Sequence, residues 1–337
     1  TKPKVYQNRE NADRSLRYAK NNQHLIKICV FEKGNCFYVI LTYTNTVRKI
    51  SNYHWDSRLD FLGGKVIRQN REGINEVVIN PIQKMWTWEP HHQLPGQIFV
   101  SRLWTGICIF ATILDVDGVL EWFVSTKTSF LCQYSKSAKS FLPKISSSLM
   151  NITFCFQFID YENIFTGESH LTCGTKGLYL IRAWKNSDFS LLNYNELLSI
   201  NKVMGEEIHL SEQRLMTNEQ FEGLVNKYNH PETRMDIRKG FVINTMDGRI
   251  FKIMTKPWIK FSQFPIVDEK NIKKFMYDLC KSKQKSNLLS GRQAVLNEIK
   301  KFYPHLTDTS FGYNQVRIHE IQKLEILVNE TIDKIIS

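Results

Sequence analysis

The feature that most constrains the fold is a long series of short apolar runs separated by turn signals. The first two runs lie in residues 27–45, are rich in β-branched and aromatic residues, and are joined by Gly34-Asn35, a pair typical of hairpin turns. The polar, basic stretch before them, residues 8–22, is expected to form a short helix or an arm. Further β-type runs follow at residues 64–67, 76–79, 106–113, 120–126, 153–159, 177–183, 241–244 and 250–254, so strands are expected to dominate up to about Lys256.

The sequence changes character after Val267. Three Lys-rich stretches follow, with apolar residues recurring at intervals of three and four: NIKKFMYDLCKSKQKS (271–286), GRQAVLNEIKKFY (291–303) and VRIHEIQKLEILVNETIDKIIS (316–337). This period predicts helices. We therefore expect two domains, a β-rich one over residues 1–264 and a C-terminal helical one over residues 265–337. The apolar stripe of the last helix is expected to pack on the chain's own helices.

The charge balance favours a polyanionic partner. The chain has 45 Lys+Arg against 33 Asp+Glu, a net charge of +12. Because cations that neutralise phosphates release counterions, nucleic acid is the first candidate. A Lys-rich surface that only keeps the chain soluble explains the charge equally well. An anionic membrane surface ranks third, since no basic amphipathic helix or lipidation signal is evident.

The seven cysteines stand singly, with no C-x-x-C pair and no histidine at ligand spacing. They are expected to be reduced core residues. No apolar run is long enough to span a bilayer, and no leading apolar segment indicates secretion. The prediction is a cytoplasmic protein with no membrane partner.

The order of eight sequence fragments is a stronger indication of fold and function than any one of them alone. They are EVVINPIQKMW (76–86), LWTGICIF (103–110), VSTKTS (124–129), FCFQFID (154–160), GLYL (177–180), KGFVI (239–243), FKIM (251–254) and KPW (256–258). In this order they resemble the motifs of the nucleotidyltransferase module of fungal tRNA ligases and, more distantly, of phage RNA ligases. The resemblance covers residues 61–264. It implies an α+β fold in which antiparallel sheets form a nucleotide pocket, followed by a small C-terminal helical domain.

The chemistry of that family requires a lysine that attacks ATP, acidic groups for ribose and metal, and basic groups that neutralise phosphates. The lysine should open a K-x-N-G or K-x-D-G motif, and the matching stretch here begins at Leu103 and ends at Gly106. Only the glycine remains. Arg102 precedes the motif, but a guanidinium stays protonated and cannot act as an amine nucleophile.

The other motifs have changed at their reactive positions as well. Gln157 replaces the glutamate of a Phe-Glu motif, and Lys239 replaces the glutamate of a Glu-Gly motif. Lys252 is followed by Met254 in place of a second lysine, and the expected Arg-Gly reads Gly63-Gly64. Within the resemblance, these changes predict a pseudoenzyme with no catalytic residue, no metal site and no cofactor.

Basic residues nevertheless remain at or beside the motif strands. The predicted RNA- or phosphate-binding set is Arg102, Lys127, Arg182, Lys239, Lys252, Lys256, Lys84 and Trp86. Trp86, with Trp88 and Trp258, offers aromatic faces that suit stacking of an unpaired base. The alternative for any single tryptophan is core packing, and for any single lysine a solvated surface.

Two further patterns favour plain loops. Adjacent residues on a strand point to opposite faces, so His91-His92 is not expected to bind one metal. The stretch 115–118, DVDG, resembles the start of a calcium loop but has no acidic residue at the twelfth place, and a hairpin turn explains it better.

Three functions follow from these patterns. The leading hypothesis is an inactive tRNA-ligase-like protein that binds RNA, namely tRNA or its cleaved anticodon arm. By analogy and composition it would be an immunity protein that shields tRNA from an anticodon-nuclease toxin. The second is an active, divergent nucleotidyltransferase that uses ATP and Mg²⁺, with Lys127 or Lys65 as the nucleophile. The third is a subunit that binds and regulates a ligase or nuclease.

Overall fold

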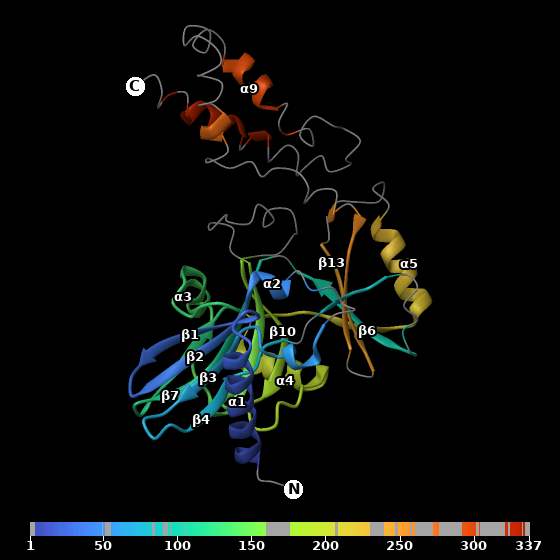
Figure 1. Ribbon diagram of the computed structural model, residues 1–337. Helices are drawn as coiled ribbons and strands as arrows, with labels where there is room; N and C mark the ends of the chain where they lie inside the picture. Colours follow the sequence, from blue (N-terminus) through green and yellow to red (C-terminus); the bar gives the residue numbers. More distant parts are fainter. Residues whose placement is uncertain are drawn as a thin grey trace.

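The computed structural model describes residues 4–48, 50, 55–82, 85–89, 94, 96–104, 106–159, 176–205, 208–229, 239–246, 249–256, 258–259, 272–275, 292–300, 303, 321–322, 324–331 and 333 (Figure 1). Within these residues, strands form three sheets and helices cover their outer faces. The predicted α+β class, with sheets that are largely antiparallel, is confirmed.

The first sheet is antiparallel, with the order β1 (Ile26–Lys33), β2 (Cys36–Tyr43), β3 (Lys65–Gln69) and β4 (Asn75–Ile79). The predicted hairpin turn at Gly34-Asn35 joins β1 to β2, and Gly34 has a positive φ of 59°. Side chains alternate along β2, since Tyr38 and Ile40 belong to one hydrophobic cluster and Val39 and Leu41 to another. Both faces of this sheet are therefore covered.

The second sheet has the order β11 (Ile208–Leu210), β10 (Gly177–Lys185), β9 (Ile152–Ile159), β7 (Ile107–Val116) and β8 (Val119–Ser125). The predicted hairpin turn between β7 and β8 is confirmed, because Asp117 and Gly118 both have positive φ and Asp115 accepts a bond from the Gly118 N–H at 2.8 Å. Asn35 Nδ2 donates to Asp117 Oδ1 at 2.8 Å, so the tips of the two hairpins are joined.

These two sheets pack face to face. Their shared cluster combines Tyr38, Ile40 and Val66 of the first sheet with Phe110 and Phe123 of the second. The opposite face of the second sheet is covered by α3 (Gln133–Lys139) and α4 (Tyr194–Met204). The resulting layers are the scaffold on which the site is built.

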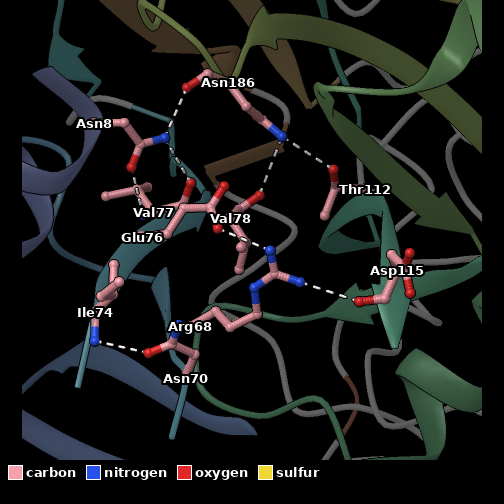
Figure 2. A network of polar contacts seen from close by, with 10 residues as sticks. All are labelled: Asn8, Arg68, Asn70, Ile74, Glu76, Val77, Val78, Thr112, Asp115 and Asn186. Atoms are coloured by element: carbon pink, nitrogen blue, oxygen red, sulfur yellow. Dashed lines mark hydrogen bonds and ion pairs between the residues drawn. The ribbon is translucent and has the colours of Figure 1, made fainter. Parts of the chain in front are cut away.

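Helix α1 (Lys4–Asn21) covers the outer face of the first sheet. Of the two alternatives for residues 8–22, a helix or an arm, the structure has the helix, and it starts earlier. Its buried positions Asn8, Ala12, Ser15 and Ala19 recur with the helical period. Polar contacts anchor it: Asn8 Nδ2 donates to the carbonyls of Val77 at 3.1 Å and Asn186 at 3.0 Å. Figure 2 shows how Asn186 continues this network to Thr112 of β7.

The third sheet has the order β12 (Gln213–Met216), β6 (Ile98–Leu103), β13 (Gly240–Thr245), β14 (Ile250–Met254) and β5 (Trp86–Thr87). Helix α5 (Asn218–Asn229) covers it through Phe221 and Val225. The sequence patterns did not predict β5, β6, β11 and β12, nor the helices α3, α4, α5 and α2 (Asn45–Arg48).

After residue 271 the described residues include α9 (Arg292–Lys300) and helical segments at 272–275, 321–322 and 324–331 (Figure 1, orange to red). Their buried side chains form a separate cluster around Tyr303, made only of residues from 272 to 328. The predicted boundary at 264/265 falls on residues that the structure does not describe and remains a prediction. None of the described helices is both long and apolar enough to cross a bilayer.

Candidate functional site

A cavity of about 700 Å³, here called the motif pocket, lies where the second and third sheets meet. Strands β6, β7, β9 and β14 contribute side chains from Leu103 to Met254, which are 151 positions apart in the sequence. The described lining is Tyr43, Val47, Ile50, Trp55, Gly63, Ile82, Met85, Thr87, Leu103, Trp104, Gly106, Cys108, Lys127, Thr128, Cys155, Gln157, Ile181, Lys239, Lys252 and Met254. The set includes every position singled out above as a changed motif residue.

Three lysines set the electrostatics of the pocket. Lys127 is exposed. Lys239, just before β13, and Lys252, on β14, are half-buried. Burial lowers the pKa of Lys252, and the neighbouring charges of Lys127 and Lys239 lower it further. The described lining residues include no carboxylate. This wall therefore attracts anions.

The glycines of two motifs are kept for a steric reason. Gly106 has a φ of 94°, and a Cβ there would overlap the carbonyl oxygen of Phe158 on β9. A Cβ on Gly240 would likewise overlap the carbonyl oxygen of Ile253 on β14. Close approach of the strands requires glycine at both positions, whatever chemistry the pocket performs.

The aromatic residues at the pocket differ from those predicted. Trp258 is 1% exposed, so it cannot stack a base and the core-packing alternative is correct for it. Trp86 and Trp88 pack with the cluster under α5, away from the described pocket lining. Trp104 and Trp55 line the pocket instead.

Trp104 is held by a hydrogen bond and by two ring contacts. Its Nε1 donates to Ser211 Oγ at 3.0 Å, and its ring centroid lies 4.3 Å from that of Tyr179. The guanidinium of Arg102 lies over the same ring at 4.3 Å. Arg102 is thus not among the described lining residues, but it contacts Trp104, which is.

Two cysteines meet at the floor of the pocket. Cys108 Sγ on β7 and Cys155 Sγ on β9 lie 3.6 Å apart as free thiols. Their shared hydrogen bond and burial raise the pKa of the Cys155 thiol. No sequence spacing indicated this contact, because it depends on the pairing of strands that are 47 residues apart.

The other predicted binding residues lie elsewhere. Lys256 is exposed outside the described pocket lining, and Lys84 lies outside the described residues. Arg182 was expected in this pocket, and that expectation is wrong. A β-bulge between Leu180 and Arg182 leaves Ile181 in the motif pocket and places Arg182 in a second cavity beneath α1.

ATP and Mg²⁺, the groups that the resemblance implies for an active enzyme, fit the pocket unequally. Three lysines suit phosphates. Mg²⁺ takes carboxylate oxygens, and the described lining offers the neutral Gln157 and the cation Lys239 in place of two acids. Within the described part of the chain, no three His, Cys, Asp or Glu side chains group as metal ligands, and His91-His92 lies outside that part.

No protein-family profile matches the sequence, and no curated protein is similar to it in sequence. Solved structures are similar in fold. An archaeal ATP-dependent RNA ligase is 13% identical with a TM-score of 0.52, and the match covers 95% of this chain and 78% of the ligase. A putative ATP-dependent DNA ligase from Aquifex aeolicus is 12% identical with a TM-score of 0.51, covering 94% and 78%. The protein therefore has the nucleotidyltransferase fold of ATP-dependent RNA and DNA ligases.

Proposed function

We propose that this protein binds RNA through the motif pocket and does not catalyse nucleotidyl transfer. One observation carries the proposal: the described lining of the pocket has three lysines and no carboxylate. A wall of this kind attracts phosphates but gives a divalent metal no acidic ligand. The ligase-type fold makes RNA the first polyanion to test, since an RNA ligase of that fold acts on RNA.

The proposed loss of catalysis rests on Leu103, Gln157 and Lys239. The resemblance assigns these positions to the nucleophile and to two glutamates, and all three line the pocket. Leu103 has no nucleophilic atom. Gln157 is neutral, and Lys239 adds a positive charge where the resemblance expects a metal ligand.

In its finer form the proposal concerns tRNA. A ligase-type surface that holds an anticodon arm without joining it would shield that arm from a nuclease. This form is supported by the resemblance to fungal tRNA ligases and by analogy alone. It predicts that the protein protects tRNA from an anticodon nuclease in a mixture of purified components, and that a variant deficient in RNA binding does not.

RNA binding is tested by fluorescence anisotropy with a labelled anticodon stem-loop over a series of KCl concentrations. A triple variant of Lys127→Gln, Lys239→Gln and Lys252→Gln is expected to bind at least tenfold more weakly. Its slope of log K against log [KCl] should fall by about 2, because roughly 0.7 to 0.9 of a counterion is released per phosphate contact.

The matched control changes three exposed lysines, Lys20, Lys136 and Lys202, to glutamine. It has the same net charge as the test variant. Equal losses in both triple variants would mean that the RNA senses only the overall charge, and the motif pocket would be abandoned as the site.

Catalysis is tested by incubation with radiolabelled ATP or GTP and Mg²⁺ or Mn²⁺, followed by denaturation. No retained label is expected beside an active ligase. Covalent label would support the divergent enzyme, and a Lys127→Arg variant would then locate the nucleophile. A protein-binding subunit would be supported by a pull-down partner that persists after complete RNA digestion.

A further inference from the structure

A second cavity, of about 610 Å³, lies beneath α1 and is here called the α1 cavity. Helix α1, the segment before β3, and β10 all contribute to its wall. Although Arg182 was expected among the motif residues, it lies here, together with Lys65 of β3. Among the described residues, none that lines the α1 cavity also lines the motif pocket.

Both cations are buried, and no described residue supplies a counter-charge to either. Lys65 is 3% exposed and Arg182 is 5% exposed. Lys65 Nζ donates to two neutral acceptors, Asn11 Oδ1 at 2.7 Å and Ser15 Oγ at 3.2 Å. Arg182 Nη2 has no hydrogen-bond partner, and no carboxylate in the described part of the chain pairs with either residue. Buried charges are ordinarily paired, because desolvation costs several kcal/mol per ion.

The rest of the described wall does not supply the missing negative charge. Arg14 and Arg58 also line the cavity, and Asp60 is its one carboxylate among the described lining residues. Asp60 Oδ1 accepts from Trp55 Nε1 at 2.9 Å. Arg58 is paired with Asp56 at 2.8 Å, on the helical turn before Asp60. Apart from the paired Arg58, three cations thus face one carboxylate among the described lining residues.

The titration behaviour agrees with this geometry. Burial and, to a smaller extent, the charge of Arg14 together lower the pKa of Lys65 to about 7. Burial lowers the pKa of Arg182 to about 10. In both groups the effect of burial outweighs the interactions that favour the charged form. An anion in the cavity would supply what both lack.

Backbone strain points to the same place. Phe61 and Phe189 both have positive φ, at 61° and 59°, and both line the α1 cavity. Bulky residues seldom adopt this conformation, and such strain gathers where the surroundings hold a side chain in position for function. With Tyr18 and Trp184, they give the cavity an aromatic wall beside its cations.

We propose that the α1 cavity is a second binding site that takes a phosphate group attached to a nucleoside, with Arg182 and Lys65 as its ligands. The proposal does not depend on the function of the motif pocket, since the two cavities have separate linings. A free nucleotide and the phosphorylated end of an RNA share this chemistry, and the experiment separates them.

The test uses isothermal titration of the full chain at constant ionic strength, with AMP, adenosine and a short RNA carrying a 5′-phosphate as probes. AMP is expected to bind and adenosine is not. Lys65→Met and Arg182→Met should each weaken AMP binding at least tenfold, while Arg182→Lys retains part of it. A complex with the phosphorylated RNA that is tighter than the AMP complex and is weakened by Arg182→Met assigns the site to an RNA end. Tighter binding of AMP, or RNA binding that Arg182→Met leaves unchanged, assigns it to a free nucleotide.

The variants also carry their own check on folding. Methionine replaces a buried charge, so each methionine variant should unfold at the same temperature as the wild type or higher without ligand. Lys202→Met, at an exposed lysine outside the described linings of both cavities, is the control and should bind AMP as the wild type does. The proposal is overturned if AMP does not bind the wild type, if adenosine binds equally well, or if Lys252→Met, in the motif pocket, loses AMP while Arg182→Met keeps it.

Discussion

The motif pocket and the α1 cavity use positive charge in opposite ways. In the motif pocket the main chain is tightly constrained, at Gly106 and Gly240, while the lysines reach toward solvent or are half-buried. In the α1 cavity the charges themselves are buried, at Lys65 and Arg182. Solvated cations cost little, so they can remain on a surface that has no specific ligand. Buried cations are expensive, and their presence calls for a compensating partner.

The largest effect is expected where the main chain of the motif pocket is tightest. Gly106→Ala should destabilise the fold by about 4 kcal/mol, because the new Cβ overlaps the Phe158 carbonyl and φ is positive. Chemical denaturation measures the change. Gly223→Ala is the control: it lies in α5 with nothing near its Cβ, and alanine should stabilise the helix by up to about 1 kcal/mol. Equal stability of both variants would show that the pocket's main chain is not constrained.

Next in size is the removal of a buried charge from the α1 cavity. Lys65 has an ordinary pKa of 10.5 when unfolded and a folded pKa of about 7. Between these values the unfolded chain holds a proton that the folded chain does not, so stability rises with pH across this window. Lys65→Met lacks this dependence and should be more stable than the wild type by about 3 kcal/mol near pH 6.

That difference should shrink steadily as the pH rises from 7 toward 10.5. Urea unfolding of both proteins across the range provides the measurement. A difference that stays constant with pH would mean that Lys65 is charged and solvated in the folded protein, and the contrast between the two cavities would disappear.

The third-largest loss of stability is expected when the contacts that hold α1 over the α1 cavity are removed. Asn8→Ala removes two donated bonds and the bond that Asn8 Oδ1 accepts from the Val77 N–H at 2.7 Å. Loss of this buried network should cost about 2 kcal/mol. Hydrogen exchange of α1 amides should increase more than exchange of β9. The exposed neighbour Arg9→Ala is the control. Uniform loss of protection would indicate that α1 has no separate role in closing the cavity.

The smallest effect concerns the charges of the motif pocket. Because the pKa of Lys252 is lowered, this side chain loses its proton at a lower pH than an ordinary lysine. RNA affinity should therefore fall about threefold between pH 7 and 9, and Lys252→Gln should remove that decline. Anisotropy titrations at the two pH values decide the matter. A decline of the same size in the variant would assign it to another group.

The strand framework followed from the sequence because alternation and turn pairs are local signals. Gly34-Asn35 and Asp117-Gly118 join strands as predicted, and the runs at 153–159 and 177–183 are strands β9 and β10. Helix α4 was missed although its capping pair, Asn193 and Glu196, is a sequence signature of a helix start. Strand β6 was missed although its last residue, Leu103, opens one of the motif fragments.

The position of Arg182 could not be predicted, since a single bulge in β10 alters which cavity each following side chain faces. The Cys108–Cys155 contact depends on strand pairing, which leaves no pattern of spacing. Trp258 shows a further limit of sequence-based prediction. An aromatic residue beside lysines suggests a site for base stacking, but the structure shows that its ring is buried.

The tight strand contacts at Gly106 and Gly240 have a consequence for protein engineering. Because packing between strands constrains the main chain at these glycines, we expect that Leu103, Gln157 and Lys239 can be replaced with little change in the backbone. The fold would then serve as a scaffold into which catalytic side chains can be introduced. A variant with lysine at position 103 and glutamate at positions 157 and 239 would measure how much nucleotidyltransferase activity these three side chains restore to the fold.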